Sequence, residues 1–443
     1  MQDKNNSTWG EKTPICVVVG GQWGSESKGL VAGHICRERD IKYAVRTGAI
    51  NAGHTVYHNG KKYVNQQLPV GWVNPKTELI LGPGTYVHAP TLYKEREMID
   101  EATGLHSQSR IWIDKNAGLH TDEHHHKEAG LHERMGSTGE GCMEAIKEKL
   151  ERSFDYQLFK DTAYAREYLF RDTVELLNIA YDRGQGILLE GTQGTMLDLH
   201  LGEYPYVTSR QTGASAWVAE AGLSPSLQYE VVMVCRMKPI RVAGNSGALP
   251  NEISWPSLAR SINESLAANG KPPIVAEAAI VAFEDIEAET KKQWGMPEGE
   301  LQYYSPLQRK TFSKEISNLH KEVLNVIGEN AVQAELKKLF EFTTVTKKLR
   351  RIANLDHDSL MRAVQINRPS SLAITFLNYQ YPSCWGAKTW EEFEACAEYS
   401  KIMEDLKKMA MEYKVNISYV NCAPDCVIPV PANHFLRQQS YAW

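Results

Sequence analysis

The sequence lacks the features that mark membrane-spanning and nucleic-acid-binding proteins. No stretch long enough to cross a bilayer is free of charged residues. Lys and Arg, 49 together, do not outnumber Asp and Glu, 54 together, so the net charge is −5. The strongly basic surface that nucleic acids require is therefore not expected. The composition predicts a globular protein that acts on small molecules, with no nucleic acid and no membrane among its partners.

Cysteine is too dispersed to indicate a disulfide framework. The eight cysteines lie mostly inside apolar runs, which predicts a reducing compartment, the cytoplasm. Cys422 and Cys426 lack a second pair that would complete a metal site, so both are interpreted as buried thiols.

Residues 1–13 are polar, without an apolar segment, and predict a flexible tail rather than a signal peptide. Residues 14–443 are then expected to form a single domain.

A glycine-rich turn is the most informative local pattern. The β-branched run at 16–19 ends in Gly20-Gly21, and apolar residues at helical spacing follow Lys28. A strand, a glycine turn and a helix in this order form an anion site, because backbone N–H groups, the helix N-terminus and a lysine converge. The strict P-loop pattern fails, since Gln22, Ser27 and Gly29 occupy its fixed positions. A tight turn with an incidental lysine is the alternative.

The rest of the chain alternates strands and helices, as an α/β protein does. Asn59-Gly60 between two short strands predicts a hairpin. Amphipathic stretches predict helices over 90–102 and 390–413 and an amphipathic run over 313–340. Short apolar runs predict buried strands at 42–46, 79–81, 111–113, 187–189, 230–234, 371–377 and 416–420.

A histidine-rich stretch, 120–132, contains His124-His125-His126. Three adjacent histidines cannot all face one ion from a regular element. A solvated surface is therefore expected here rather than a zinc site.

Several motifs together resemble the adenylosuccinate synthetase family, which joins aspartate to C6 of a purine nucleotide with a nucleoside triphosphate. GQWGSESKG at 21–29 resembles the family's GQWGDEGKGK. The other matching segments are TGAINAGHT at 47–55, GSTGEG at 136–141, EGTQGT at 190–195, YPYVTS at 204–209, RVAG at 241–244, FTTVTKKLRRIANLD at 342–356 and NCAPD at 421–425. They run in order from about residue 15 to 425. The resemblance implies a large mixed, mostly parallel central sheet with flanking helices.

This sequence departs from the family at chemically decisive positions. Ser25 stands where the family has the aspartate that acts as base and metal ligand, and Ser27 replaces a glycine. Ile50 replaces the catalytic histidine. Asn378, after Phe376, replaces the aspartate that pairs with the guanine of GTP. An unassisted serine is too weak a base for the carboxylate's task, and isoleucine cannot donate a proton.

The resemblance assigns the site residues by position. As catalytic residues it implies Ser25, Lys28 and Gln193. As nucleotide (dGMP) contacts it implies Ser25, Ala49, Ile50, Asn51, Ser137, Thr138, Arg152, Gln193, Thr208 and Val242. As triphosphate (ATP) contacts it implies Gly24, Ser27, Lys28, Gly29, Leu30, Asn51, Gly53, His54, Thr55, Arg350, Asn378, Ala423 and Pro424. As aspartate contacts it implies Thr344, Val345, Thr346, Lys348 and Arg350, and as Mg2+ contacts Ser25 and the Ala49 carbonyl.

Three functional interpretations stay open. The first is an IMP-using adenylosuccinate synthetase, and the loss of both catalytic groups counts against it. The second is a non-catalytic nucleotide-binding paralogue, which would not need the retained aspartate loop. The third is the phage-type branch that converts dGMP, aspartate and ATP or dATP into N6-succino-2-amino-2'-deoxyadenylate for diaminopurine DNA, in the host cytoplasm. The replacements at Ser25, Ile50 and Asn378 together favour the third.

Two further expectations concern organisation. Arg152 aligns with a family arginine that reaches the neighbouring subunit's phosphate site, which implies a homodimer. Residues 257–340 resemble the family least and are interpreted as a divergent insertion.

Overall fold

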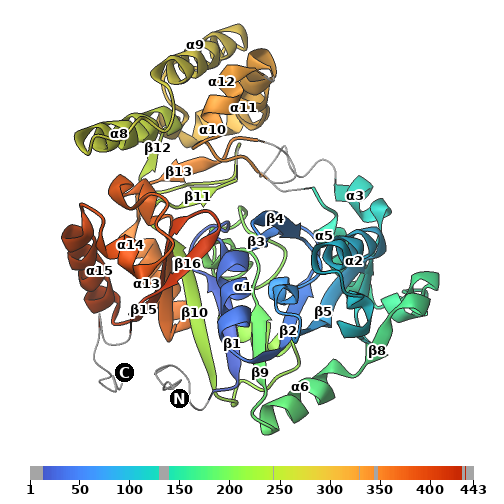
Figure 1. Cartoon of the computed structure of the whole chain (residues 1–443). Coiled ribbons are helices and arrows are strands. Elements are labelled where there is room, and N and C mark those ends of the chain that lie inside the picture. The colour runs from blue at the N-terminus through green and yellow to red at the C-terminus, as the bar shows by residue number, and fades with distance from the viewer. Residues whose placement is uncertain are drawn as a thin grey trace.

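The computed structural model describes residues 13–128, 139–242, 244–328, 330–343, 348–431 and Phe435. Within these residues, eleven strands form one sheet in the order β16-β15-β14-β10-β1-β9-β2-β5-β6-β8, with β7 also paired to β5 (Figure 1). The strands are β1 (Ile15–Gly20), β2 (Ile41–Gly48), β5 (Glu78–His88), β6 (Ile111–Asp114), β7 (Gly118–His120), β8 (Leu169–Arg171), β9 (Gly186–Glu190), β10 (Tyr229–Arg236), β14 (Ser371–Thr375), β15 (Asn416–Ala423) and β16 (Cys426–Pro429). All pair in parallel except β15 and β16. The predicted mixed, mostly parallel sheet is confirmed.

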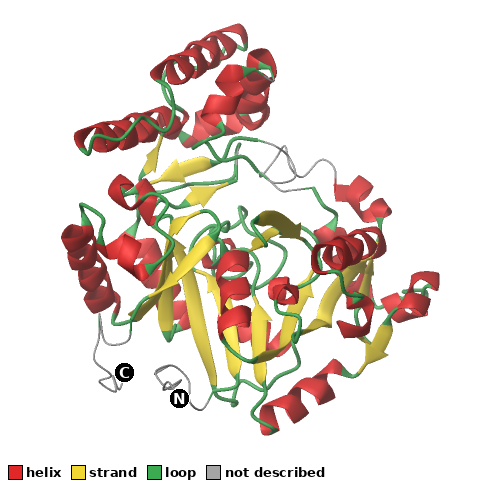
Figure 2. Cartoon of the chain, viewed as in Figure 1, coloured by secondary structure: helices red, strands yellow, loops and turns green. Residues whose placement is uncertain are grey.

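Both faces of the sheet are covered by helices, as a parallel sheet requires (Figure 2). Side chains of β1 alternate between two apolar cores: Val17 and Val19 face one, Cys16 and Val18 the other. α1 (Lys28–Glu38) and α2 (Ala89–Thr103) cover one face, and α6 (Thr173–Asp182), α7 (Ala214–Glu220), α13 (His357–Asn367) and α15 (Tyr399–Tyr413) cover the other. α3 (Asp122–Glu128), α5 (Cys142–Glu151) and α14 (Trp390–Glu394) complete this part.

A separate group of helices lies beyond a small second sheet (Figure 1). The sheet consists of β11 (Ile240–Arg241), β13 (Arg351–Ala353) and β12 (Glu252–Ile253). The helices are α8 (Trp255–Ala268), α9 (Glu277–Gln293), α10 (Pro306–Thr311), α11 (Ser313–Ile327) and α12 (Ala331–Leu336). They share an apolar core with the small sheet, in which Phe283 packs edge-to-face on Phe340. This group occupies most of 257–340, whose interpretation as an insertion stays a prediction.

Local predictions are confirmed where the signal is short-range. The hairpin is β3 (His54–His58) and β4 (Lys61–Asn65), with Asn59 and Gly60 both at positive φ, as its turn requires. Two predictions are wrong in their bounds. The helix expected over 390–413 is split into α14 and α15, and the strand expected to reach Leu377 ends at Thr375, because the backbone turns left-handed at Phe376 (φ 54°).

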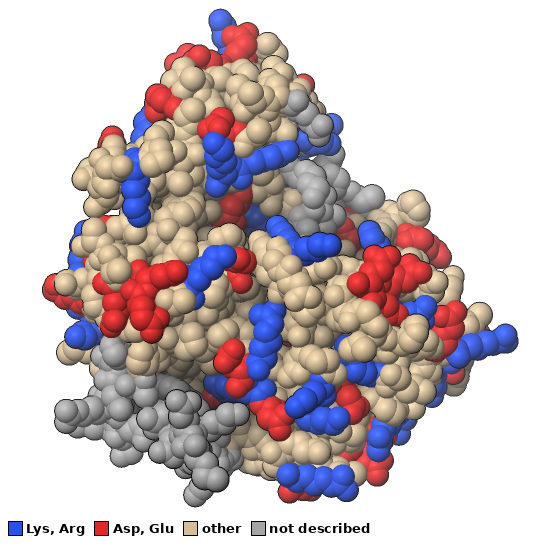
Figure 3. Space-filling model, in the orientation of Figure 1, with Lys and Arg blue, Asp and Glu red and all other residues tan. Residues whose placement is uncertain are grey.

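No described helix has both the length and the apolar composition needed to span a membrane. Acidic and basic side chains are interspersed on the face shown in Figure 3. On this face, Lys and Arg side chains do not form a broad basic surface.

Candidate active site

A cavity of about 580 Å3 lies beside the carboxyl ends of the central parallel strands. The glycine-rich turn follows β1, residues 51–55 follow β2, Gln193 follows β9, and Phe376 follows β14. The opposite wall comes from residues 337–343 with Lys348 and Arg350. Ligands of parallel α/β sheets bind at this edge, because the connections after neighbouring strands converge there.

The cavity is strongly cationic although the chain as a whole is acidic. Seven basic residues line it: Lys28, Lys62, Arg236, Lys337, Lys338, Lys348 and Arg350. Among the described lining residues the single carboxylate is Glu341, and both of its oxygens accept hydrogen bonds from Arg236. A water-accessible space with this excess of positive charge is suited to polyanions such as nucleotides and dicarboxylates.

The glycine-rich turn is organised by Glu26, a residue that sequence reasoning missed. Its carboxylate is fully buried and accepts backbone hydrogen bonds from Gln22 (3.1 Å) and Gly24 (2.8 Å) through Oε1. Its Oε2 lies 2.6 Å from the Lys28 Nζ. Ser27 then adopts a left-handed conformation and α1 begins at Lys28. Glu26 therefore holds both the turn and the lysine in place. In the sequence, this role is indicated only by the position of a carboxylate two residues before Lys28.

Ser25 lies between two arginines at the centre of the cavity. Its Oγ is 2.5 Å from Arg350 Nη1, and its main-chain carbonyl accepts from Arg236 Nη1 at 3.2 Å. The Arg236 guanidinium stacks on the Phe376 ring, 3.5 Å from its centroid. Sequence reasoning also missed Arg236 and its partner Glu341, because 105 residues separate them.

His54 belongs to a buried charged network. Its Nδ1 lies 2.5 Å from Glu190 Oε1, which also accepts from Arg46 Nη1 at 3.2 Å, while Oε2 accepts from the Val70 main chain at 2.7 Å. Burial, assisted by Arg46, lowers the pKa of His54 to about 4 despite its hydrogen bond to Glu190. Although burial acts to raise the pKa of Glu190, His54 and Arg46 hold it below its usual range. His54 is therefore neutral at pH 7 and donates from Nδ1, leaving Nε2 as an acceptor.

Gly29 allows this network to approach α1 closely. A Cβ on Gly29 would lie 2.8 Å from the His54 Cβ and 2.9 Å from the Thr55 carbonyl. Any side chain at position 29 would push the hairpin away from the start of α1.

The structure brings most of the predicted site residues together around the cavity. Those that line it are Gly24, Ser25, Ser27, Lys28, Gly29, Asn51, Gly53, His54, Thr55, Gln193, Val242, Lys348, Arg350 and Pro424. Those that do not are Leu30, Ala49, Ile50, Arg152, Thr208, Asn378 and Ala423. Ser137, Thr138, Thr344, Val345 and Thr346 fall outside the described residues. All of these assignments stay predictions.

The residues outside the lining have identifiable surroundings. Ala49 and Ile50 are buried against Cys142, and the Ile50 carbonyl accepts from Gln66 Nε2 at 2.8 Å. Arg152 is exposed at the end of α5. Asn378 is 6% exposed and lies behind the turn whose Phe376 faces the cavity.

Comparison with known proteins agrees with this geometry. The family model described as adenylosuccinate synthetase matches residues 17–158 and 153–421. The chain belongs to the adenylosuccinate synthetase family. Its active site is therefore that of a carbon–nitrogen ligase of purine nucleotide biosynthesis.

Curated relatives have moderate sequence identity to this chain. The adenylosuccinate synthetase of Methanococcus aeolicus is 38% identical over 242 residues, which cover 54% of this chain and 69% of the relative. That of Methanococcus maripaludis strain C5 is 28% identical over 413 residues, covering 92% of this chain and 96% of the relative.

One similar solved structure is the succinoaminodeoxyadenylate synthetase (PurZ) of cyanophage S-2L, which is bound to dGMP and to dATP as an energy donor. Its TM-score to this chain is 0.64, at 22% sequence identity. The match covers 95% of this chain and 96% of that chain. The fully ligated adenylosuccinate synthetase of Plasmodium falciparum has a TM-score of 0.63 at 17% identity, covering 94% and 100%. Both confirm the fold.

Proposed function

We propose that the protein joins L-aspartate to C6 of dGMP, with ATP or dATP as phosphoryl donor. The products are N6-succino-2-amino-2'-deoxyadenylate, phosphate and ADP or dADP. The observation that carries the proposal is the cationic cavity in which Ser25, and not a carboxylate, projects from the glycine-rich turn. The cyanophage enzyme that shares this fold, and whose structure holds dGMP and dATP, supports the choice of substrates.

The serine explains a preference for a 2-aminopurine. In the family the carboxylate at this position takes the N1 proton of a 6-oxopurine, and guanine carries an amino group beside N1. A serine is shorter and its oxygen accepts a hydrogen bond from that amine. Ser25 is exposed to the cavity in this structure, and once a bound substrate covers such a group, its match to a substrate N–H discriminates against the analogue that lacks that N–H. IMP, which has no 2-amino group, would leave Ser25 without this partner.

The reaction proceeds through two displacements. O6 of the purine attacks the γ-phosphorus of the triphosphate while the N1 proton passes to a phosphate oxygen or to water, and the nucleoside diphosphate leaves. The neutral aspartate amine then attacks C6, phosphate departs with O6, and the amine proton passes to the departing phosphate or to water. Lys28 and Arg350 stabilise the negative charge that develops on the transferring phosphoryl group. Arg350 and Lys348 also offer cations to the aspartate carboxylates.

Mg2+ is assigned to the triphosphate and not to a resident protein site. Mg2+ takes six oxygens, and here the chain's predicted donors are one serine hydroxyl and the Ala49 carbonyl. Glu26, the nearest carboxylate in sequence, is already engaged by Lys28 and two backbone N–H groups. The triphosphate, aspartate and water would supply the other oxygens, and the bound cation would neutralise phosphoryl charge.

The donor is proposed to be an adenine nucleotide. Guanine presents N1–H and a 2-amino group, which need acceptors, and a carboxylate supplies two. No free carboxylate lines the described part of the cavity, since Glu341 is taken up by Arg236. Phe376 offers a flat apolar surface on which a base can stack.

The competing assignment is an IMP-using adenylosuccinate synthetase, which the names of the archaeal relatives favour. A panel of acceptors separates the two. IMP, GMP and dGMP are each supplied with aspartate and ATP or GTP, and phosphate release and product mass are measured. The proposal predicts efficient turnover of dGMP with ATP or dATP and little of IMP. Comparable kcat/KM for IMP would overturn it.

A further inference from the structure

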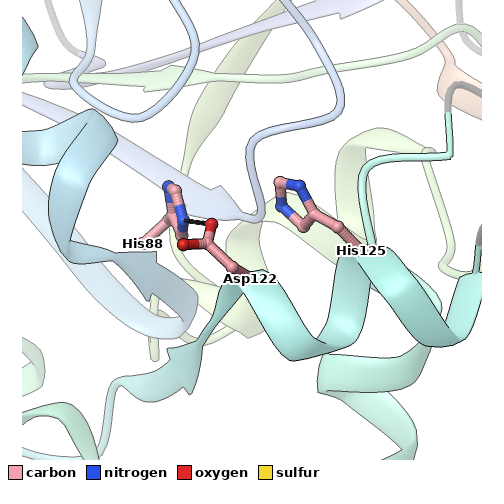
Figure 4. Close-up of side chains that lie close together, drawn as sticks. All are labelled: His88, Asp122 and His125. Atoms are coloured by element: carbon pink, nitrogen blue, oxygen red, sulfur yellow. Dashed lines mark hydrogen bonds and ion pairs between the residues drawn. The ribbon is translucent and has the colours of Figure 1, made fainter.

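A second cluster of chemically active side chains lies outside the cavity, on β5, β7 and α3. His88 ends β5, and Asp122 and His125 belong to α3 (Figure 4). His120 ends β7. None of the four lines the cavity. Ligand atoms of His88, Asp122 and His125 all lie within 4.8 Å of one another. Asp122 and His125 share one helix face because they are three residues apart.

The expected solvated histidine tract is wrong for part of this stretch. His124 is buried and bonds Glu148 on α5 through Nε2 at 2.5 Å, while His126 is exposed. Adjacent histidines therefore do point in different directions. The side chains that come together are His125 and Asp122 of α3 and His88 of β5.

His120 is the second, independent sign of a ligand. The residue is 1% exposed, and among the described residues neither of its ring nitrogens makes a hydrogen bond of normal geometry, although the Glu140 main chain is close enough to influence the ring. Its ring lies 5.1 Å from that of His125 and 5.4 Å from that of His88, centroid to centroid. His125 Nε2 is likewise buried with no such bond to a described residue. A buried polar group without a hydrogen bond costs on the order of 1–3 kcal/mol, so unsatisfied nitrogens on two neighbouring rings are the second observation that points to a ligand.

We propose that His88, Asp122 and His125, whose ligand atoms converge, form a binding site for a divalent transition metal of the Zn2+ type, with the neighbouring His120 as the candidate fourth ligand. Two imidazoles and one carboxylate, with His120 or water in the fourth position, are a ligand set that Zn2+ accepts in tetrahedral geometry. Hard Mg2+ prefers oxygen ligands and is disfavoured. The ion would link β5, β7 and α3.

The surroundings of His88 suit this role. Its Nδ1 lies 2.8 Å from the Thr91 hydroxyl, and its Nε2 lies 3.1 Å from Asp122 Oδ1. A metal between Nε2 and the carboxylate would replace the proton that they share. Nδ1–H would then donate to Thr91, which fixes the ring as an outer hydrogen bond usually does at metal sites.

The test is titration of the purified, chelator-treated full-length protein with Zn2+ in the presence of excess Mg2+. Calorimetry is expected to show one Zn2+ per chain, and Co2+ in place of Zn2+ is expected to give visible d–d bands without a strong thiolate charge-transfer band. Asp122→Asn and His125→Ala should each weaken binding about tenfold or more. His126→Ala, a change at an exposed neighbour on the same helix, is the matched control and should bind as the wild type does.

Folding is monitored separately. Asp122 has an exposed side chain, so Asp122→Asn is expected to keep the metal-free melting temperature, while losing the increase that Zn2+ gives the wild type. The proposal is overturned if the wild type binds no Zn2+. It is equally overturned if Asp122→Asn and His125→Ala bind as tightly as the wild type, or if Co2+ gives a thiolate spectrum.

Discussion

At the residue scale, the active site is marked by backbone strain. Ser25 (φ 61°), Ser27 (φ 69°), Gln193 (φ 62°) and Phe376 (φ 54°) are non-glycine residues in the left-handed region. All four line the cavity. Each such residue costs on the order of 1 kcal/mol or more, and the surrounding contacts must maintain it. Glu26, which lies between Ser25 and Ser27, holds the residues on either side of them, because its buried carboxylate bonds the Gln22 and Gly24 main chain and the Lys28 ammonium.

Removing the charge of Glu26 should therefore destabilise the protein. Glu26→Gln leaves the Lys28 ammonium buried without its partner, and breaking a buried pair costs on the order of 3–5 kcal/mol. The matched control is Lys388→Gln, which breaks the more exposed pair with Asp425 and should cost less than about 1 kcal/mol. Urea unfolding measures both. Equal stabilities of Glu26→Gln and the wild type would contradict the role given to Glu26.

His54 gives the stability a pH dependence of predictable sign. Its pKa is about 4 in the folded protein against 6.5 when exposed, so below pH 6.5 the unfolded chain binds more protons. The free energy of unfolding should fall as the pH decreases from 6.5 to about 4, by on the order of a few kcal/mol from this residue.

His54→Gln should reduce that dependence, because glutamine does not titrate, while His34 and His120, whose pKa values burial lowers to about 4 and about 3, keep their share of it. His126→Gln, at an exposed position, is the control and should not reduce it. The measurement is urea unfolding at pH 7 and pH 5. An unchanged difference between the two pH values in His54→Gln would show that His54 is not the group responsible.

At the element scale, the turn after β14 tests the proposed adenine-nucleotide donor. Phe376 lines the cavity and stacks on Arg236, whereas Asn378 lies behind it. Phe376→Ala should raise the KM for ATP about tenfold, since stacking of a base on an aromatic ring contributes on the order of 1–3 kcal/mol. The KM for aspartate should change little.

A substitution at Asn378 tests hydrogen bonding to the base, whereas Phe376→Ala tests stacking. If Asn378 itself pairs with adenine, Asn378→Asp should weaken ATP use and restore GTP only partly, because Phe376 remains. Steady-state kinetics with both triphosphates decide this. Wild-type activity with GTP equal to that with ATP would refute the adenine preference.

The end of α5 tests the predicted homodimer. Arg152 is exposed in one chain, which is consistent with a role toward a neighbour. Arg152→Ala should raise the KM for dGMP while circular dichroism shows an intact fold. The control is Arg166→Ala at another exposed arginine.

Mixing two impaired variants gives a sharper version, assayed at a dGMP concentration low enough that Arg152→Ala alone shows little activity. Dimers assembled from Lys28→Ala and Arg152→Ala chains contain one native site in each mixed pair, so about a quarter of the sites should regain activity. A fully active monomer, or no recovery on mixing, would rule out the shared site.

At the scale of the whole molecule, short-range patterns were predictable and long-range partners were not. The hairpin, the glycine-rich turn and the alternation of strands and helices follow from neighbours in sequence. The sheet order, which places β9 between β1 and β2, does not. The family resemblance supplied the predicted site, and the cavity gathers most of it. Glu190 lies 136 residues from His54, so no spacing rule could pair them. Glu26 is a short-range exception: its partners, Gln22, Gly24 and Lys28, are close in sequence, but the pattern of residues does not show that the turn buries this carboxylate.

The central claim is that Ser25 makes the cavity selective for a 2-aminopurine nucleotide. The most direct measurement is a competition in which equal concentrations of dGMP and IMP react together with aspartate and ATP, and the two succino products are separated by mass. Their initial ratio equals the ratio of the kcat/KM values. We expect the wild type to favour the dGMP product by about tenfold or more, and Ser25→Asp to lower that ratio by a similar factor. A wild-type excess of the IMP product, or a ratio that Ser25→Asp leaves unchanged, would contradict the claim.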